Sequence, residues 1–379
     1  MQARYLAASP HNLVRIILGE RRESDSASEN VYTRAAGHFE GWIRDGILAQ
    51  DAAPAFYAYF QEFDVPDSAE RLTRKGFIGL GKLEDYAAGV VYRHEQTFAG
   101  PKKDRLEVLR HTRAHFGQIF VLYPDREGAI DRELEEAAQG EPVLDVTDEY
   151  GVRNTVFAMT GAARIARIQE QMAAAKLLIA DGHHRYETSL AYRDEHPGDA
   201  AAQYTMMTFV NMYSPGLKIL ATHRMLRGME GFSAEALLQK AKAPWWAKPY
   251  DSVKALKREL GEPTPQSVRI GLVTGDGMWV LSRPRGEGEL DVPVLHREIL
   301  GDWLGIGEES GGIETLITYM RGIDAAMAEV RNGGAQAAFL LEATPIHDMA
   351  RIAFGGGVMP QKSTDFFPKM LSGVAIYRL

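Results

Sequence analysis

The chain has 379 residues and no cysteine, and its 43 basic and 51 acidic residues give a formal net charge of −8. At roughly 150 residues per domain, this length predicts two or three domains. The absence of cysteine excludes disulfides, thiolate zinc sites, iron–sulfur clusters and thiol nucleophiles. The acidic balance argues against extensive nucleic-acid binding, because a surface that neutralises phosphates carries an excess of Lys and Arg.

The N-terminus lacks the basic stretch, apolar run and small residues of a secretory signal. The longest apolar runs are far shorter than the roughly 20 residues that cross a membrane. We therefore expect a cytoplasmic protein with no membrane partner.

Apolar periodicity and turn residues predict mixed helices and strands in chain order. The first 227 residues contain predicted helices at 31–48, 106–115, 129–138, 162–175 and 186–195, and predicted strands at 13–18, 55–63, 76–83, 118–123, 154–159, 176–180, 206–212 and 218–221.

A composition shift near Gly228 introduces helices at 234–242 and 252–260 and strands at 268–274 and 278–282. The Asp276-Gly277 pair between the two strands indicates a hairpin. The remaining chain is predicted to be helical to Val330, followed by a strand at 337–341, a helix at 345–354 and a strand at 373–377. We therefore expect three regions: a mixed core (1–227), a small α/β subdomain (228–287) and a segment returning to the core (288–379).

Four polar residues and a glycine follow the predicted strand at 176–180, in the order Asp181, Gly182, His183, His184, Arg185. Glycine lets the backbone approach a ligand, and the start of the following helix offers N–H groups and a positive dipole end to an anion. Arg185 adds a bidentate donor, and Asp181 is a candidate metal ligand or general base. The alternative is that Asp181 only caps the helix and the histidines pack or face solvent.

A second polar segment contains His94, Glu95 and Thr97 and is followed by Lys102 and Arg105. Glu95 is a candidate carboxylate base, and the two cations are candidate phosphate ligands. His94 and Thr97 are candidate substrate contacts. A solvated basic helix face is the alternative for the cations.

The third segment contains Lys362, Ser363 and Thr364. It does not fit the P-loop pattern, because Gln361 precedes the lysine. A lysine with two hydroxyls after a glycine-rich turn still makes a candidate phosphate-contacting loop, and a simple domain-closing turn is equally compatible. His223 and Arg224, after a predicted strand, are further candidate substrate contacts.

In order and spacing, these three motifs resemble the conserved bacterial and archaeal family known as domain of unknown function 1015, over nearly the whole chain. The Asp-Gly-His-His-Arg turn is also similar to the phosphate-binding turn of the ParB/sulfiredoxin superfamily, and within it to free-serine kinase. The resemblance implies an α+β fold with a ParB/sulfiredoxin-like mixed core and an inserted small α/β subdomain. It places residues 181–185 at a phosphate and metal site.

Members of this family usually begin with extra residues, including a Pro-Tyr-Asp-type segment, ahead of the part that resembles 4–15. We therefore expect that such a segment is missing from this chain. A sulfiredoxin activity is excluded, since it needs a cysteine in the turn.

The resulting hypothesis is a small-molecule kinase that uses ATP or ADP and Mg²⁺ to phosphorylate free L-serine, with Glu95 or Asp181 as the base. A homodimer is compatible with it. The alternatives are a non-catalytic nucleotide-binding regulator or ParB-like DNA-associated protein, and a phosphatase or other hydrolase that uses the same anion site. The net charge and the lack of a clear basic recognition helix argue against the DNA-associated form.

Overall fold

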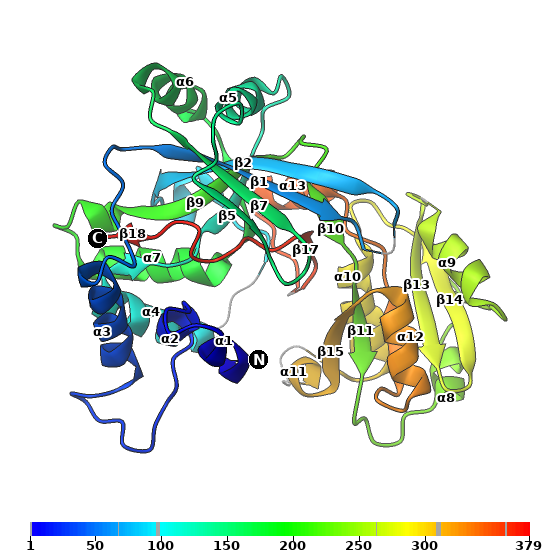
Figure 1. The fold of residues 1–379 in the computed structure, drawn as a ribbon. Coiled ribbons are helices and arrows are strands. Elements are labelled where there is room, and N and C mark those ends of the chain that lie inside the picture. Colours follow the sequence, from blue (N-terminus) through cyan, green and yellow to red (C-terminus); the bar gives the residue numbers. More distant parts are fainter. Residues whose placement is uncertain (1, 67, 96–98, 263, 308–311, 361) are drawn as a thin grey trace.

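The computed structural model describes residues 2–66, 68–95, 99–262, 264–307, 312–360 and 362–379. Two large sheets organise these residues into two lobes, and both chain termini belong to the lobe of the larger sheet (Figure 1). The α+β mixture predicted from the sequence is confirmed.

The larger lobe is built on an eight-stranded mixed sheet. Its strands, in spatial order, are β3 (Val91–Tyr92), β8 (Leu177–Asp181), β5 (Ile119–Tyr123), β9 (Tyr204–Asn211), β2 (Arg71–Lys82), β1 (Phe56–Asp64), β7 (Arg153–Met159) and β6 (Leu144–Thr147). The pairs β3–β8 and β5–β9 are parallel, and the other neighbours are antiparallel.

Both faces of this sheet are covered, as strand β5 illustrates. Val121 packs into a cluster with residues of α5 (Ala129–Ala137) and α6 (Ala162–Met172). Its neighbour Leu122 packs on the opposite face against α13 (Ile346–Phe354). Alternate residues of a strand point to opposite faces, so a strand covered on both sides is a continuous apolar run. This explains why the sequence signal for β5 is clear.

The second lobe holds a six-stranded antiparallel sheet. Its order is β12 (Trp246–Pro249), β14 (Gly277–Pro284), β13 (Ser267–Thr274), β16 (Ala337–Leu340), β11 (Thr222–Leu226) and β15 (Ile317–Arg321). The hairpin predicted at Asp276 joins β13 to β14. This sheet takes strands from all three regions expected from the sequence, since β11 precedes residue 228 and β15 and β16 follow residue 287.

The other elements are mostly helices and two short strand pairs. They are α1 (Gln2–Ala8), α2 (Val14–Ile17), α3 (Val31–Arg44), α4 (Ala99–Thr112), α7 (His183–Glu195), α8 (Ala234–Gln239), α9 (Val253–Gly261), α10 (Asp291–Val294), a π-helix (Leu295–Trp303), α11 (Gly312–Leu316), α12 (Ile323–Arg331), 3₁₀ turns at Tyr86–Ala88 and Ala201–Gln203, and the pairs β10 (Lys218–Leu220) with β17 (Asp365–Phe367) and β4 (Ala114–His115) with β18 (Tyr377–Arg378).

Two predicted elements are of the wrong type, and the terminal strand predicted at 373–377 is confined to Tyr377–Arg378. Residues 13–18, predicted as a strand, contain helix α2, where the Asn12 side chain accepts the N–H of Val14. A short apolar run does not distinguish a strand from a buried helical turn. Here the backbone N–H groups of Ile17 and Leu18 donate to the carbonyl oxygens of Leu13 and Val14. Residues of β15, predicted as helical, form an edge strand because they pair with β11.

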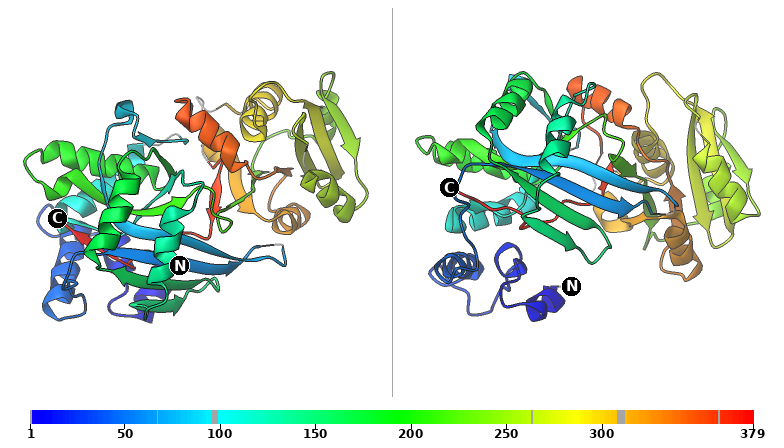
Figure 2. Two further views of the ribbon diagram at one scale, coloured as in Figure 1. Left: turned by 90° about the horizontal axis from the view of Figure 1, so that it is seen from above. Right: turned by 45° about the horizontal axis from the view of Figure 1, so that its top comes forward.

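The last part of the chain connects the two lobes. We call residues 359–370 the C-terminal segment; within it, β17 pairs with β10 beside the second lobe. Helix α13, which precedes the segment, lies at the junction of the lobes in both views of Figure 2. The residues after the segment run back across the larger lobe, and the chain ends beside the N-terminal helix α3 (Figure 1).

Gly216, in the turn between β9 and β10, packs directly on strand β2. A Cβ added to Gly216 would overlap the backbone carbonyl of Thr73 and lie 2.7 Å from the Cα of Arg74. Because neither backbone can move freely, Gly216→Ala should lower the free energy of unfolding by about 1–3 kcal/mol. Urea unfolding followed by circular dichroism measures this change. Gly198→Ala, where a Cβ would meet nothing within 4 Å, is the control and should change stability by less than about 0.5 kcal/mol.

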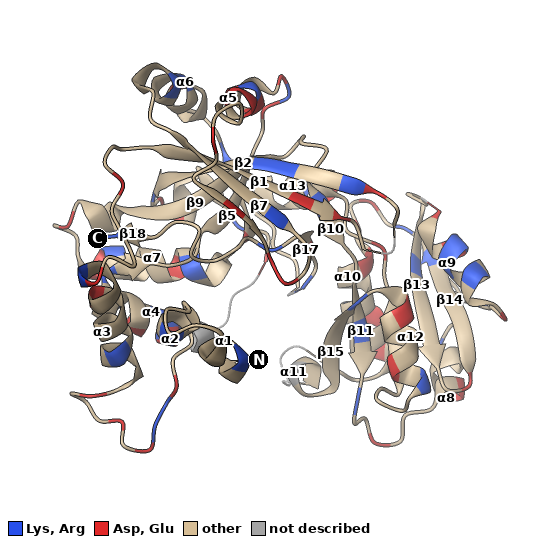
Figure 3. Cartoon of the chain, viewed as in Figure 1, with Lys and Arg blue, Asp and Glu red and all other residues tan. Residues whose placement is uncertain are grey.

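Acidic and basic residues are interspersed on α3, α7 and α12 (Figure 3). Among the described residues, none of the helices has the length and apolar character needed to cross a bilayer.

Candidate functional site

The 181–185 turn joins the end of β8 to the start of α7, as the sequence predicts. Gly182 has a φ of +100°, which favours glycine, and a Cβ there would lie 2.8 Å from Nη2 of Arg185. The guanidinium therefore folds back over the glycine and donates to Oδ2 of Asp181 at 2.7 Å. Substitution of the glycine would both strain the backbone and displace this arginine.

A cleft of about 450 Å³ opens in front of the turn, between the two lobes. The larger lobe contributes the turn itself and Glu95 and Arg105, the second lobe contributes residues of β11 and β15, and the C-terminal segment closes one side. The full lining is Glu95, Arg105, Ala180, Asp181, Gly182, His183, His184, Arg185, Thr222, Tyr319, Met320, Arg321, Lys362, Thr364, Asp365 and Lys369. The three sequence motifs thus meet at one cavity.

Buried polar side chains fix the C-terminal segment against the turn. His94 is completely buried, with one ring nitrogen 2.8 Å from the carbonyl oxygen of Ile179 and the other 2.7 Å from Oγ1 of Thr364. Arg224, also completely buried, donates to the carbonyl oxygen of Lys362 at 3.0 Å. These contacts hold Lys362 and Thr364 at the cleft by their backbone and hydroxyl groups, which leaves the lysine side chain exposed.

Cations dominate the electrostatics of the cleft. Five basic side chains line it, against three carboxylates: Arg105, Arg185, Arg321, Lys362 and Lys369 face Glu95, Asp181 and Asp365. Lys369 lies 3.4 Å from Asp181 and 3.1 Å from Asp365. The carboxylate of Asp365 also accepts a hydrogen bond from the guanidinium of Arg321. The cleft is locally positive although the whole chain has a net charge of −8.

Asp181 stays ionised in this setting. Burial by itself would raise its pKa, but Arg185 and Lys369 outweigh burial and lower the pKa to about 2. A group with so low a pKa is a poor proton acceptor near neutral pH. Asp181 is therefore better suited to orienting cations than to acting as the base.

Glu95 has the opposite character. Burial raises its pKa to about 7, against the opposing effect of Lys362, whose backbone N–H donates to the carboxylate. The next residues after Glu95 lie outside the described part of the chain. A carboxyl group with a pKa near neutrality can exchange a proton under physiological conditions.

The buried histidines His94 and His183, beside the 181–185 turn, are neutral at pH 7. His94 and His183 stack edge to face, with ring centroids 4.8 Å apart. Burial lowers the pKa of His94 to about 4 and that of His183 well below its usual value. Nε2 of His183 is buried and has no hydrogen-bond partner among the described residues, so this cleft-lining imidazole has an unused polar atom.

Other predicted site residues lie elsewhere. Lys102 donates to Glu187 at 2.6 Å outside the cleft wall, and the Ser363 hydroxyl donates to the carbonyl oxygen of Pro360 at 2.6 Å. His223 is buried in the second lobe, where Nδ1 accepts the N–H of Leu341. Arg224 acts on the cleft through Lys362, as described above. Thr97 lies outside the described residues.

Sequence reasoning assigned no role to Arg321, Asp365 or Lys369, although the last two lie in the 362–369 segment that it singled out. Arg321 belongs to a segment that was predicted to be helical. In the structure it lies on edge strand β15, and its side chain donates to Asp365 of the C-terminal segment. Asp365 and Lys369 are four residues apart beside Pro368, a local signal that could have added them to the 362–364 motif.

The carboxylates of the cleft offer few oxygen atoms that could coordinate a metal ion. Both oxygens of Asp181 already contact cations, and Asp365 pairs with Arg321 and Lys369. In the described part of the chain, no cluster of three or more His, Asp or Glu side chains could hold a metal ion. These residues fit Mg²⁺ only in the manner usual for nucleotide sites, in which phosphates supply ligands beside one or two carboxylates.

The model of the family described as "Protein of unknown function (DUF1015)" matches residues 1–298, and the chain belongs to this family. The family predicted from the three motifs is thereby confirmed. No curated protein matches the sequence.

Several solved structures are similar to this one. A conserved hypothetical protein from Pyrococcus furiosus has a TM-score of 0.41 at 12% identity, and the match covers 78% of this chain and 93% of that one. Free serine kinase in complex with AMP has a TM-score of 0.42 at 11% identity, with coverages of 76% and 86%. A C-terminally truncated SbnI from Staphylococcus aureus has a TM-score of 0.37 at 11% identity, with coverages of 78% and 85%.

Proposed function

We propose that this protein is a nucleotide-dependent kinase that transfers a phosphoryl group to the hydroxyl of a small molecule. The observation that carries the proposal is the composition of the cleft: a helix start and five cations beside Glu95, whose pKa of about 7 suits a general base. Free L-serine is the acceptor implied by the resemblance of the 181–185 turn to that of free-serine kinase.

Phosphoryl transfer needs mainly positioning and charge stabilisation. The N-terminal end of α7 and Arg185 would hold the phosphates of ATP or ADP, with Arg105 and Lys362 adding positive charge. Glu95 would accept the hydroxyl proton while the acceptor oxygen bonds to the terminal phosphorus. The bond from that phosphorus to the bridging oxygen breaks, and ADP leaves when ATP is the donor, or AMP when ADP is the donor.

Mg²⁺, when bound with the nucleotide, would neutralise charge on the phosphate oxygens. Asp181 is the candidate ligand, provided that Lys369 or Arg185 turns from the carboxylate to the phosphates. Lys369 is the better placed to do so, because it also contacts Asp365 and its contact with Asp181 is the longer of the two.

The activity test uses purified protein, L-serine, Mg²⁺ and either ATP or ADP, with O-phosphoserine detected by mass spectrometry. We expect O-phosphoserine and an equal amount of ADP or AMP. Other small alcohols are screened in the same assay. The residues of the cleft argue for an acceptor with a hydroxyl group, whereas serine in particular is implied only by the resemblance of the turn. Phosphate release with no phosphorylated alcohol would contradict the proposal and favour a hydrolase.

Binding gives a second test. Arg185→Ala removes a charge-assisted donor worth about 1.5–3 kcal/mol, so it should weaken ADP binding about 10- to 100-fold in calorimetry. Arg44→Ala is the control, because the side chain of Arg44 is 76% exposed, pairs with Asp45 and does not line the cleft. Equal ADP affinity in the two variants would show that the nucleotide does not use the turn.

A further inference from the structure

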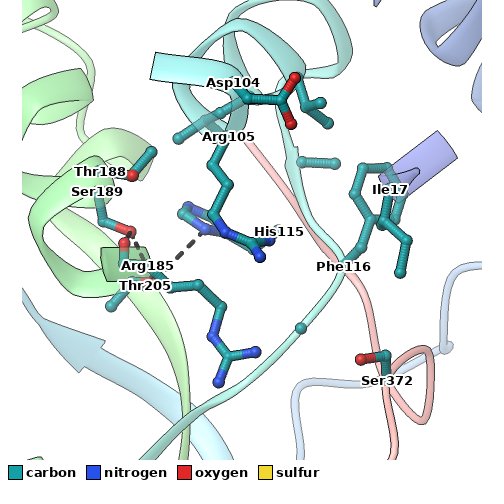
Figure 4. Close-up of a pocket in the computed structure, with 14 residues that line it drawn as sticks. Ile17, Asp104, Arg105, His115, Phe116, Arg185, Thr188, Ser189, Thr205 and Ser372 are labelled. Carbon is teal, nitrogen blue, oxygen red and sulfur yellow. Dashed lines mark hydrogen bonds between the residues drawn. The ribbon is translucent and has the colours of Figure 1, made fainter. Parts of the chain in front are cut away.

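A second, smaller cavity lies behind the cleft, between α4, α7 and the segment that leads into β5 (Figure 4). Its volume is about 100 Å³, and it is lined by Ile17, Asp104, Arg105, Val108, Leu109, Ala114, His115, Phe116, Gly117, Arg185, Thr188, Ser189, Thr205 and Ser372. Arg105 and Arg185 line both cavities, so two guanidinium groups form the wall between them. Among the described residues of the sequence motifs, only these two line this pocket.

The walls of the pocket differ from those of the cleft. One side is apolar, formed by Ile17, Val108, Leu109 and Phe116. The other side carries hydroxyl and imidazole groups: Oγ of Ser189 lies 3.2 Å from Oγ1 of Thr205, which lies 3.5 Å from Nδ1 of His115. An apolar side facing a few placed polar groups is an arrangement that can hold the ring of a small ligand.

The charged side chains that line the pocket are Arg105, Arg185 and Asp104. Burial lowers the pKa of His115 to about 4, so its imidazole is neutral at pH 7. Asp104 is turned outward, where it accepts from Arg21 and Tyr32. Among the described residues, none pairs with the guanidinium of Arg105. The pocket therefore suits a neutral body with an anionic tail that crosses the arginine wall into the cleft.

We propose that this pocket is the subsite for the nucleoside end of the phosphate donor. The inference rests on the proposed function, because it takes the phosphates to lie at the 181–185 turn. Glu95 lines the cleft and not the pocket, so the acceptor hydroxyl must lie in the cleft. The pocket on the far side of the arginine wall is then left for the opposite end of the donor.

The volume of the pocket limits how much of the nucleotide donor can enter it. A cavity of about 150 Å³ holds benzene, so the 100 Å³ here admits only the edge of a base or part of a ribose. The remainder of the nucleoside would lie outside the pocket.

Gly117 offers a way to fill the pocket without disturbing the fold. A Cβ there would lie 3.5 Å from Nη1 of Arg185 and 3.7 Å from Oγ of Ser372, both ordinary contacts. The series Gly117→Ala and Gly117→Val therefore adds volume in steps. Gly161→Val, at the exposed start of α6 where a Cβ meets nothing within 4 Å, is the matched control.

The experiment compares ADP with inorganic pyrophosphate, which has the phosphates and no nucleoside, by isothermal titration calorimetry at constant Mg²⁺. We expect Gly117→Val to weaken ADP binding at least tenfold and Gly117→Ala about two- to fivefold. Pyrophosphate affinity should stay within twofold in both, and Gly161→Val should match the unmodified protein for both ligands. Thermal unfolding of each variant checks the fold, and the milder Ala variant keeps the test decisive if the Val variant unfolds.

Three results would overturn the inference. In the first, the affinities for ADP and for pyrophosphate fall equally, which would mean that the substitution acts through Arg185. In the second, ADP affinity is unchanged while the KM for the acceptor rises, which would assign the pocket to the acceptor. In the third, the unmodified protein binds ADP no better than pyrophosphate. If the ADP results are as expected but no alcohol is phosphorylated, the kinase proposal fails and the nucleoside subsite stands.

Discussion

Replacing Glu95 by Gln should lower kcat for phosphoryl transfer about 10²- to 10⁴-fold, the usual contribution of a general base. ADP affinity should change no more than a few-fold, because the amide retains the shape of the side chain and its acceptor oxygen for the backbone N–H of Lys362. The loss should therefore fall on kcat and not on nucleotide binding.

The pH profile gives this prediction a sharper form. Only the ionised carboxylate of Glu95 accepts a proton, and its pKa is raised to about 7. In the unmodified protein, kcat should therefore rise with pH through a midpoint near 7 and level off above about pH 8. In Glu95→Gln this rise should be absent from the residual activity.

Glu127→Gln provides the matched control for Glu95. The side chain of Glu127 is exposed in the loop before α5 and does not line the cleft, so its substitution should leave both kcat and the pH profile unchanged. A Glu95→Gln enzyme with normal kcat would contradict the assignment of the base while leaving the phosphate site untested by that change.

Replacing Arg74 by Met should lower the free energy of unfolding by about 2–5 kcal/mol. Arg74 is 1% exposed in strand β2, its guanidinium lies 4.8 Å from the ring centre of Phe120, and burial lowers its pKa to about 10. It donates to the side chain of Gln61 and to the carbonyl oxygens of Phe367 and Pro368. Met fills a similar volume but leaves those three acceptors without a donor.

Function should change together with stability in this variant. The two carbonyl groups immediately precede Lys369, which contacts Asp181 and Asp365. Release of the C-terminal segment would move this lysine out of the cleft, so ADP affinity should fall by several-fold even under conditions where the protein stays folded. Chemical unfolding and calorimetry measure the two effects separately.

Arg71→Met, on the same strand, is the control for Arg74. Arg71 is 65% exposed and lies 3.6 Å from Glu62, and exposed ion pairs contribute about 0–1 kcal/mol. Equal stability of the two variants would show that the buried guanidinium does not hold the C-terminal segment.

Local patterns in the sequence were sufficient for elements whose signals are contained within them. Helix α3 is an example, because Asn30 caps it by accepting the N–H groups of Tyr32 and Thr33 while Thr33 accepts the N–H of Asn30. The hairpin β13–β14 is another, since its turn residues lie between two apolar runs. Strand β15 is a counterexample, because its strand state depends on pairing with β11, almost a hundred residues earlier.

The same distinction applies to the candidate site. The sequence by itself determined the 181–185 turn, because a strand end, a glycine, the acid and the cation are contiguous and their geometry follows from the strand-to-helix connection. It also excluded thiol chemistry outright, by the absence of cysteine. Only the tertiary structure decided that Glu95 acquires a pKa near 7 and that Lys369 reaches Asp181, 188 residues earlier. Burial and contacts between distant segments cause both effects, and neither is a property of any local run of residues.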